Sequence, residues 1–191
     1  MTALLTAVLA FGVLAGCTNS ETGGNPTTAS TTGGGQTSSQ PTSEDPGTKL
    51  DVTKFVSAPC TILTASQVTT LGSVRAPEPG TSALGPNCTW DGQDSIKNST
   101  YEISVTTGKD FDAMNENSKK NGVFVDKQID GVRVISTDST DASMYCLTSI
   151  QASKTDSVTV QISTASDERA TKKPCPETER VAQLIITNLK G

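Results

Sequence analysis

The chain contains no histidine among its 191 residues. This absence removes the commonest general base at neutral pH and the commonest side-chain ligand of metal ions. Ser-His-Asp and Cys-His catalysis, and zinc sites that require histidine, are therefore excluded within this chain. Neither a Gly-x-Ser-x-Gly nor a Ser-x-x-Lys motif occurs, and these carry the other common serine nucleophiles. We expect no enzymatic activity, no cofactor and no bound metal.

The sequence also has few aromatic residues and no cluster of positive charge. Aromatic residues make up 4% of the chain, and the net charge is −5. Basic residues gather only in the pairs Lys119-Lys120 and Lys172-Lys173. Nucleic-acid binding needs a basic stripe that displaces counterions from phosphates. We therefore expect no nucleic-acid partner.

The chain begins with an apolar segment, residues 3–14, that ends in Leu-Ala-Gly-Cys at residues 14–17. The segment is too short to span a bilayer, but it has the length of a signal-peptide core. The four residues read as a lipobox, which predicts removal of residues 1–16 and attachment of acyl chains, palmitate among them, to Cys17. The first basic residue is Lys49, whereas signal peptides begin with positive charge. We expect translation to start upstream of Met1.

Residues 17–49 are expected to form a disordered tether behind the lipidated cysteine. Residues 18–49 hold nine Thr, five Ser, six Gly and three Pro, and no Val, Ile, Leu or aromatic residue. Such a segment cannot bury enough apolar surface to offset the entropy of ordering its backbone. As a flexible coil it spans roughly 30 Å on average. Its threonines are equally compatible with O-linked sugars and with a bare linker.

Residues 50–191 have the length of one domain, and their patterns predict an α+β fold with antiparallel strands. Short helices are expected from the capping box at residues 64–67 to Gly72, and from Asp110 to about Asn121, with Phe111, Met114 and Ser118 facing inward. The expected strands are residues around 88–90, the alternating segment 101–105, and two hairpins. One hairpin turns at Asp130-Gly131, and the other joins 144–150 to 157–163, with one buried face.

A longer amphipathic helix is predicted at the C-terminal end. Pro176 suits a first helical turn, and acidic residues that follow it favour the positive end of the helix dipole. An apolar stripe recurs with helical spacing at Val181, Leu184, Ile185 and Leu189. We expect this helix to pack on the antiparallel sheet.

Four cysteines lie within the predicted domain, at positions 60, 88, 146 and 175. An even number of cysteines in an exported domain indicates disulfides. Three pairings are possible, and we favour Cys60–Cys88 with Cys146–Cys175. Each closes a loop of about 30 residues, which is worth on the order of 3 kcal/mol. Free thiols or a four-cysteine zinc site are the less favoured alternatives, because no Cys-x-x-Cys occurs.

Several short motifs in this order resemble a family of actinobacterial lipoproteins known as domain-of-unknown-function family 3558. The motifs are Pro59-Cys60, Leu63-Thr64 with a short helix to Leu71-Gly72, Gly85-Pro86-Asn87-Cys88-Thr89-Trp90, and Cys175 before a helix that holds Val181-Ala182. The resemblance covers roughly residues 50–191, together with the lipobox and the threonine-rich linker. It implies a lipoprotein of the cell envelope and no established activity.

Three groups of residues are candidate sites, each with a simpler interpretation. Trp90 could stack on a ligand, but beside a disulfide cysteine a core position is favoured. Asp138 and Asp141 could bind calcium, yet the spacing of a calcium loop is absent and a solvated loop is favoured. Asp91 and Asp94 could pair as an acid and a base, but Gly92 and Gln93 between them indicate an exposed turn.

The sequence therefore predicts a disulfide-linked α+β domain, with an antiparallel sheet packed by a C-terminal amphipathic helix and two shorter helices. It would be anchored by Cys17 to the outer face of the cell membrane. We expect a non-enzymatic module that binds or supports an envelope protein, a glycan or a lipid. A carrier of small ligands or lipids, with a pocket between sheet and helix, is the alternative. A histidine-independent hydrolase is a third, less favoured possibility.

Overall fold

The computed structural model describes residues 49–191. The predicted leader, the predicted lipidation site Cys17 and the predicted tether up to residue 48 lie outside these residues. The domain is α+β, as predicted. Among the described residues no helix is both long enough and apolar enough to cross a bilayer.

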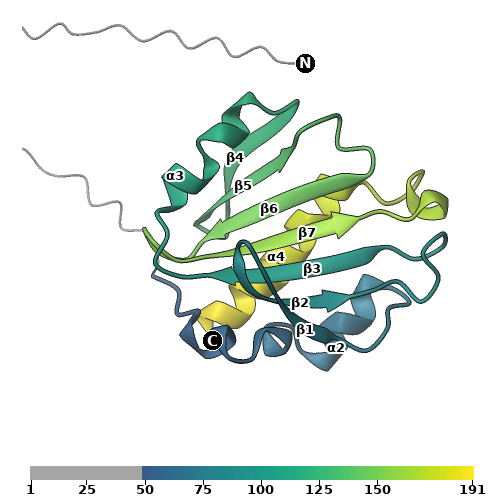
Figure 1. Cartoon of the computed structure of the whole chain (residues 1–191), viewed down its shortest axis with the longest axis horizontal. Coiled ribbons are helices and arrows are strands. Elements are labelled where there is room, and N and C mark those ends of the chain that lie inside the picture. Colours follow the sequence, from purple (N-terminus) through teal and green to yellow (C-terminus); the bar gives the residue numbers. More distant parts are fainter. Residues whose placement is uncertain (1–48) are drawn as a thin grey trace, which may run out of the picture. The chain divides into compact units, whose positions relative to one another are not determined.

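Seven antiparallel strands form one sheet in the order β1-β2-β3-β7-β6-β5-β4 (Figure 1). Their bounds are β1 Glu78–Ser82, β2 Gly85–Trp90, β3 Thr100–Thr106, β4 Val123–Ile129, β5 Val132–Asp138, β6 Tyr145–Gln151 and β7 Ser157–Ser163. The β4–β5 turn is the one predicted from Asp-Gly. Asp130 (φ 50°) and Gly131 (φ 75°) both take the left-handed conformation that a two-residue type I′ hairpin requires. β1 was not predicted, because its Pro79-Gly80 breaks the strand pattern.

The helices are short except for the last. They are α1 Thr53–Val56, α2 Ala65–Val68, α3 Phe111–Asn115 and α4 Pro174–Lys190, with 3₁₀ turns η1 Pro59–Thr61, η2 Thr69–Leu71, η3 Asn117–Lys120 and η4 Ser166–Glu168. The capping box is confirmed, since Thr64 Oγ1 accepts from the Gln67 backbone and Gln67 Oε1 accepts from the Thr64 backbone. Asp110 caps α3 as predicted, but the expected helix to Asn121 breaks into α3 and η3.

One face of the sheet carries the hydrophobic core, and α4 packs on it across β5, β6 and β7. In Figure 1 the strands lie in front of α4. The predicted stripe on α4 is displaced. Val181 and Ile185 are fully buried, as are Ala182 and Ile186, whereas Leu184 and Leu189 flank the core and are partly buried. The helix also begins earlier than Pro176, because Pro174 occupies its first turn.

Both favoured disulfides are present. Cys60–Cys88 links η1 to β2, and Cys146–Cys175 links β6 to the first turn of α4. Each cross-link therefore joins a helical segment on the core face to a strand of the sheet. Short helices α1 and η1 cover β2 and β3 beside α4, which completes the layer on this face.

Removal of the second disulfide tests how far α4 depends on it. The bridge joins residues 29 apart, and a loop of that size is worth about 3.5 kcal/mol in the chain-entropy model. We expect Cys146→Ala/Cys175→Ala to lower the free energy of unfolding by about that amount in urea denaturation. Cys60→Ala/Cys88→Ala is the matched control, because its loop of 28 residues predicts the same entropic loss. An unchanged denaturation midpoint in the Cys146/Cys175 variant would contradict the expectation.

Candidate functional site

The face of the sheet opposite α4 is polar on strands β2, β3, β7 and β6. We call this part of the face the open face. Side chains alternate along each strand, so the residues between the core positions all point to this side. Strand register places them in rows, such as Glu102–Gln161–Leu147 and Ser104–Thr159–Ser149. The full set is Asn87, Thr89, Thr100, Glu102, Ser104, Thr106, Tyr145, Leu147, Ser149, Gln151, Ser157, Thr159, Gln161 and Ser163.

The open face is bordered on two sides, and we call the strip of sheet between the two borders the trough. On one side the β1–β2 hairpin curls over β3 (Figure 1), with the Ser82 and Ser104 hydroxyl oxygens 3.3 Å apart and Thr106 donating to the Leu84 carbonyl. On the other side lies α3. There the Arg133 guanidinium stands 5.5 Å from the centre of the buried Phe111 ring and bridges Asp112 and Asp126.

The trough has a deep, hydroxyl-lined part and a more accessible part. Ser104, Ser149 and Thr159 are nearly buried, at 2%, 7% and 3% exposure, and the hydroxyls of Ser149 and Thr159 are 3.3 Å apart. Toward the other end of the strands, Gln161 and Leu147 are half-buried and Tyr145 is 44% exposed. The accessible part of this surface thus includes a carboxylate, an amide and an aromatic ring, from Glu102, Gln161 and Tyr145, which suits recognition of a polar ligand.

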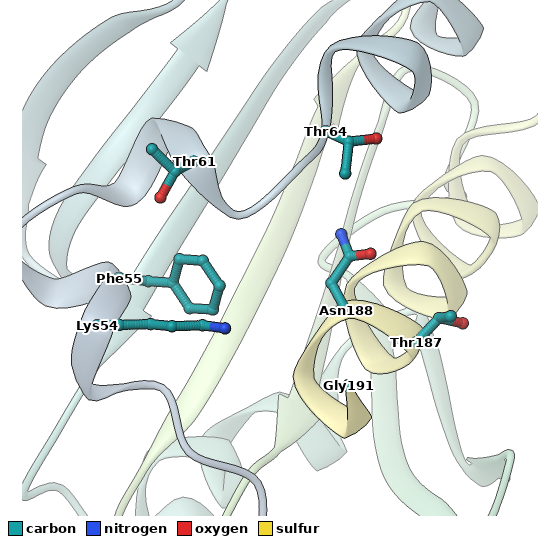
Figure 2. A pocket seen from close by; sticks show the side chains of 7 residues that line it. All are labelled: Lys54, Phe55, Thr61, Thr64, Thr187, Asn188 and Gly191. Atoms are coloured by element: carbon teal, nitrogen blue, oxygen red, sulfur yellow. The ribbon is translucent and has the colours of Figure 1, made fainter.

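A second candidate is a hollow of about 500 Å³ between the N-terminal helices and the end of α4 (Figure 2). Lys54, Phe55 and Thr61 lie on one side, and Thr187, Asn188 and Gly191 on the other. Most of its polar groups already have partners within the domain: the Asn188 amide bonds to Ile62 and Gln67, and Thr61 donates to Ala58.

A positive and a negative group also act on this hollow. The Lys54 ammonium lies 4.8 Å from the Phe55 ring centre and would attract an anion. The last turn of α4, which ends at Lys190, presents carbonyl groups and the negative end of the helix dipole to the same space. An anion is therefore disfavoured by the helix and a cation by Lys54, so the open face is the stronger candidate.

A network of titratable groups anchors the first half of α4 to the sheet. Tyr101 donates to Glu177 at 2.7 Å, and Arg180 donates to the same carboxylate and to Thr70. Burial and the bond to Glu177 raise the pKa of the Tyr101 hydroxyl well above its ordinary value. Burial raises the pKa of Glu177, but hydrogen bonds from Arg180 and Tyr101 outweigh it and hold this pKa below the ordinary value.

Glu168 extends the network toward β3. Its carboxylate accepts from the backbone and hydroxyl of Ser99 and pairs with Lys172 at 2.9 Å, and Lys172 lies 5.7 Å from the centre of the Tyr101 ring. The pKa of Glu168 is lowered because these bonds exceed the opposing effect of burial. Since its members bond to one another, we interpret this network as a structural anchor.

The candidate site residues predicted from the sequence do not come together in one site. Trp90 is fully buried in the core, as favoured. Asp138 is 6% exposed, and its carboxylate accepts from Thr140 and Ala142, so it organises its own loop. Asp141 and Asp94 are exposed and each accepts from the backbone two residues on. Asp91 is half-buried and Gly92 is buried, so the exposed turn expected from Gly92 and Gln93 is present at Gln93 and Asp94 only.

None of these carboxylates forms a metal site. Among residues 49–191 no group of three or more acidic or cysteine side chains could hold a metal ion. The residues of the open face were missed by sequence reasoning, although a signal was available. The polar positions that alternate with Tyr101, Ile103 and Val105, and those that alternate with Val158, Val160 and Ile162, share one side of adjacent strands.

A family model described as "Protein of unknown function (DUF3558)" matches residues 12–188. No curated protein and no solved structure matches the chain.

Because of the network around Glu177, the free energy of unfolding depends on pH. Because the folded pKa of Glu177 is lowered, its stabilisation is complete above an unfolded pKa of about 4.3 and is lost as pH falls through the folded value. We expect Glu177→Gln to cost about 2 kcal/mol at pH 7, by removing a charged acceptor. Urea denaturation at pH 7, 5 and 3 measures this cost, which should shrink toward pH 3.

Glu116→Gln is the matched control, since Glu116 pairs with Lys119 on an exposed surface and such pairs contribute little. A cost for Glu177→Gln that stays constant from pH 7 to pH 3 would show that its charge is not the source of the stabilisation.

Proposed function

Since this chain belongs to the family of proteins of unknown function DUF3558, we propose a role from its own residues. It is a membrane-anchored module outside the cytoplasm that binds its ligand, without catalysis, on the open face. The observation that carries this proposal is the asymmetry of the sheet. Helix α4 and the N-terminal helices occupy one face, while the trough on the other presents Glu102, Gln161 and Tyr145.

The lipobox motif at residues 14–17 supports the anchor. Acyl chains on Cys17 would hold the protein at the membrane, and two or more chains give stable attachment where one is marginal. The cysteines of the domain agree with an oxidising location, because Cys60, Cys88, Cys146 and Cys175 are all paired. Disulfides persist in exported proteins and are rare in the cytosol.

A binding role is favoured over the lipid-carrier alternative by the packing of α4. A carrier needs an apolar pocket between the sheet and this helix. That interface is filled by Val181, Ala182, Ile185 and Ile186, each fully buried. The hollow beside Lys54 lies between the N-terminal helices and the end of α4, and no strand residue lines it.

The anchor predicts acylation at one atom. Cells that express the chain should incorporate a clickable palmitate analogue into it, and the protein should fractionate with membranes. Cys17→Ser should abolish both labelling and membrane retention, because a serine hydroxyl cannot accept the thioether-linked diacylglyceryl group. Cys17→Ser protein that still sediments with membranes would refute the proposed anchor.

The binding face is tested by site-specific photo-crosslinking in intact cells. A benzophenone side chain at Gln161, in the middle of the open face, should form a discrete product that mass spectrometry detects as a mass-shifted peptide. The same group at Thr187 probes the hollow as the matched control and should form none. A discrete product at Thr187 and none at Gln161 would assign the ligand to the hollow and overturn the proposal for the open face.

A further inference from the structure

The sheet has two edge strands, and one of them is closed to further pairing. β1 and β4 are the outermost strands (Figure 1), and an edge strand presents backbone N–H and C=O groups to which another strand can bond. Ser82 and Gly85 close the turn of the β1–β2 hairpin, so the backbones of Pro79 and Thr81 point outward. Proline has no N–H to donate, and Pro79 therefore interrupts the β1 edge.

β4 has an uninterrupted edge. Ile129 and Val132 flank the type I′ turn and bond to each other, so the backbone groups of Phe124, Asp126 and Gln128 point away from β5. The strand contains no proline, and within residues 49–191 no backbone hydrogen bond from outside the sheet reaches these three residues. Their donors and acceptors are therefore available to a further strand.

Neighbouring elements leave this edge accessible. The polar contacts of α3 and the segment after η3 go to β5, where Asp112 pairs with Arg133 and Asn121 donates to Thr137. Residues 125–128 of β4 are all exposed. Val125, on the core side of the strand, is 41% exposed although its side chain is apolar. A second strand can therefore approach β4 from the side.

The charged side chains of β4 are neutralised within the same domain. Charged residues commonly protect a sheet edge from pairing. Here Asp126 pairs with Arg133 at 2.8 Å, and Lys127 pairs with Glu179 at 2.6 Å. Because each charge has a partner of opposite sign, the edge does not repel another copy of itself.

The sequence of β4 selects one register for such a pair. In an antiparallel pair about a two-fold axis perpendicular to the sheet, the residue on the axis faces its own copy. An axis at Asp126 or Lys127 would oppose like charges, which is destabilising, and an axis nearer either end would pair fewer residues. An axis at Val125 joins two apolar side chains and brings the exposed Lys120 toward the exposed Asp130 of the second copy.

We propose that two copies of this chain pair through β4, antiparallel and with Val125 on the two-fold axis, and so form one continuous sheet. Phe124 of each copy exchanges backbone hydrogen bonds with Asp126 of the other. The interface is small, so association is weak in dilute solution, but the proposed anchor would confine the copies to one membrane and raise their local concentration. The inference goes beyond the proposed function and places both open faces on the same side of the joined sheet.

Disulfide trapping in intact cells tests the register. On the axis the two Cα atoms of residue 125 would lie about 4.5 Å apart, a distance that a disulfide can bridge. Val125→Cys should therefore give a reducible dimer under mild oxidation with copper phenanthroline. Gln128→Cys, on the same exposed strand, is the matched control and should give no dimer above background, because the axis places its two copies roughly 20 Å apart.

Sedimentation equilibrium of the mature chain carrying Cys17→Ser tests the association itself. At about 100 μM the chain should show a monomer–dimer equilibrium. Val125→Lys and Val125→Glu should each weaken association about tenfold, because like charges then meet on the axis. Neither should change the melting temperature, since Val125 is exposed. An equimolar mixture of the two variants should restore the dimer, because opposite charges then face each other.

Three results would overturn the inference. A chain that stays monomeric in solution and gives no trapped product at Val125→Cys does not pair through β4. Trapping at Gln128→Cys that is as efficient as at Val125→Cys would exclude this register. A dimer that Val125→Lys leaves unchanged, or a mixture that associates no better than either variant alone, would show that Val125 does not lie on the axis.

Discussion

The packing of α4 against one face of the sheet is the interaction on which the rest of the structure depends. Val181, Ala182, Ile185 and Ile186 are fully buried there, and burial of a larger aliphatic side chain is worth about 1.5–3 kcal/mol. The Cys146–Cys175 bridge restrains the first turn of the helix on β6. Because α4 covers this face, the polar residues that alternate with the core positions lie on the opposite face, and Glu102, Gln161 and Tyr145 among them keep accessible surface.

The position of α4 is defined by polar as well as apolar contacts. Its first half bonds through Glu177 to Tyr101 and through Arg180 to Thr70, and through Glu179 to Ser136 and Lys127. Such contacts add direction to a hydrophobic interface, which by itself tolerates sliding and rotation. They hold the helix in one register over β5, β6 and β7, and so keep the shape of the sheet that carries the trough.

A domain with few aromatic residues needs additional constraints to stay folded. Among residues 49–191 the fully buried aromatic side chains are Trp90, Tyr101 and Phe111, and the two disulfides each join a helical segment to a strand. Cross-links of this kind act mainly by restricting the unfolded chain. They allow many strand positions to carry Ser and Thr instead of larger apolar residues, and a hydroxyl-lined face is compatible with stability for this reason.

Local patterns in the sequence determined much of this protein. The capping box at Thr64, the Asp130-Gly131 turn, the alternation around Ile103 and the amphipathic C-terminal helix are signals within a few residues. Each of these elements is present, and only the start and the buried stripe of the helix differ from the prediction. The favoured disulfide pairing is the observed one, although the sequence allowed two other pairings. The tertiary structure alone decided how the predicted hairpins join the other strands in one sheet, because β3 pairs with β7 across the intervening β4–β6 segment. That long-range pairing brings Glu102, Gln161 and Leu147 into one row, and no short stretch of sequence encodes this result.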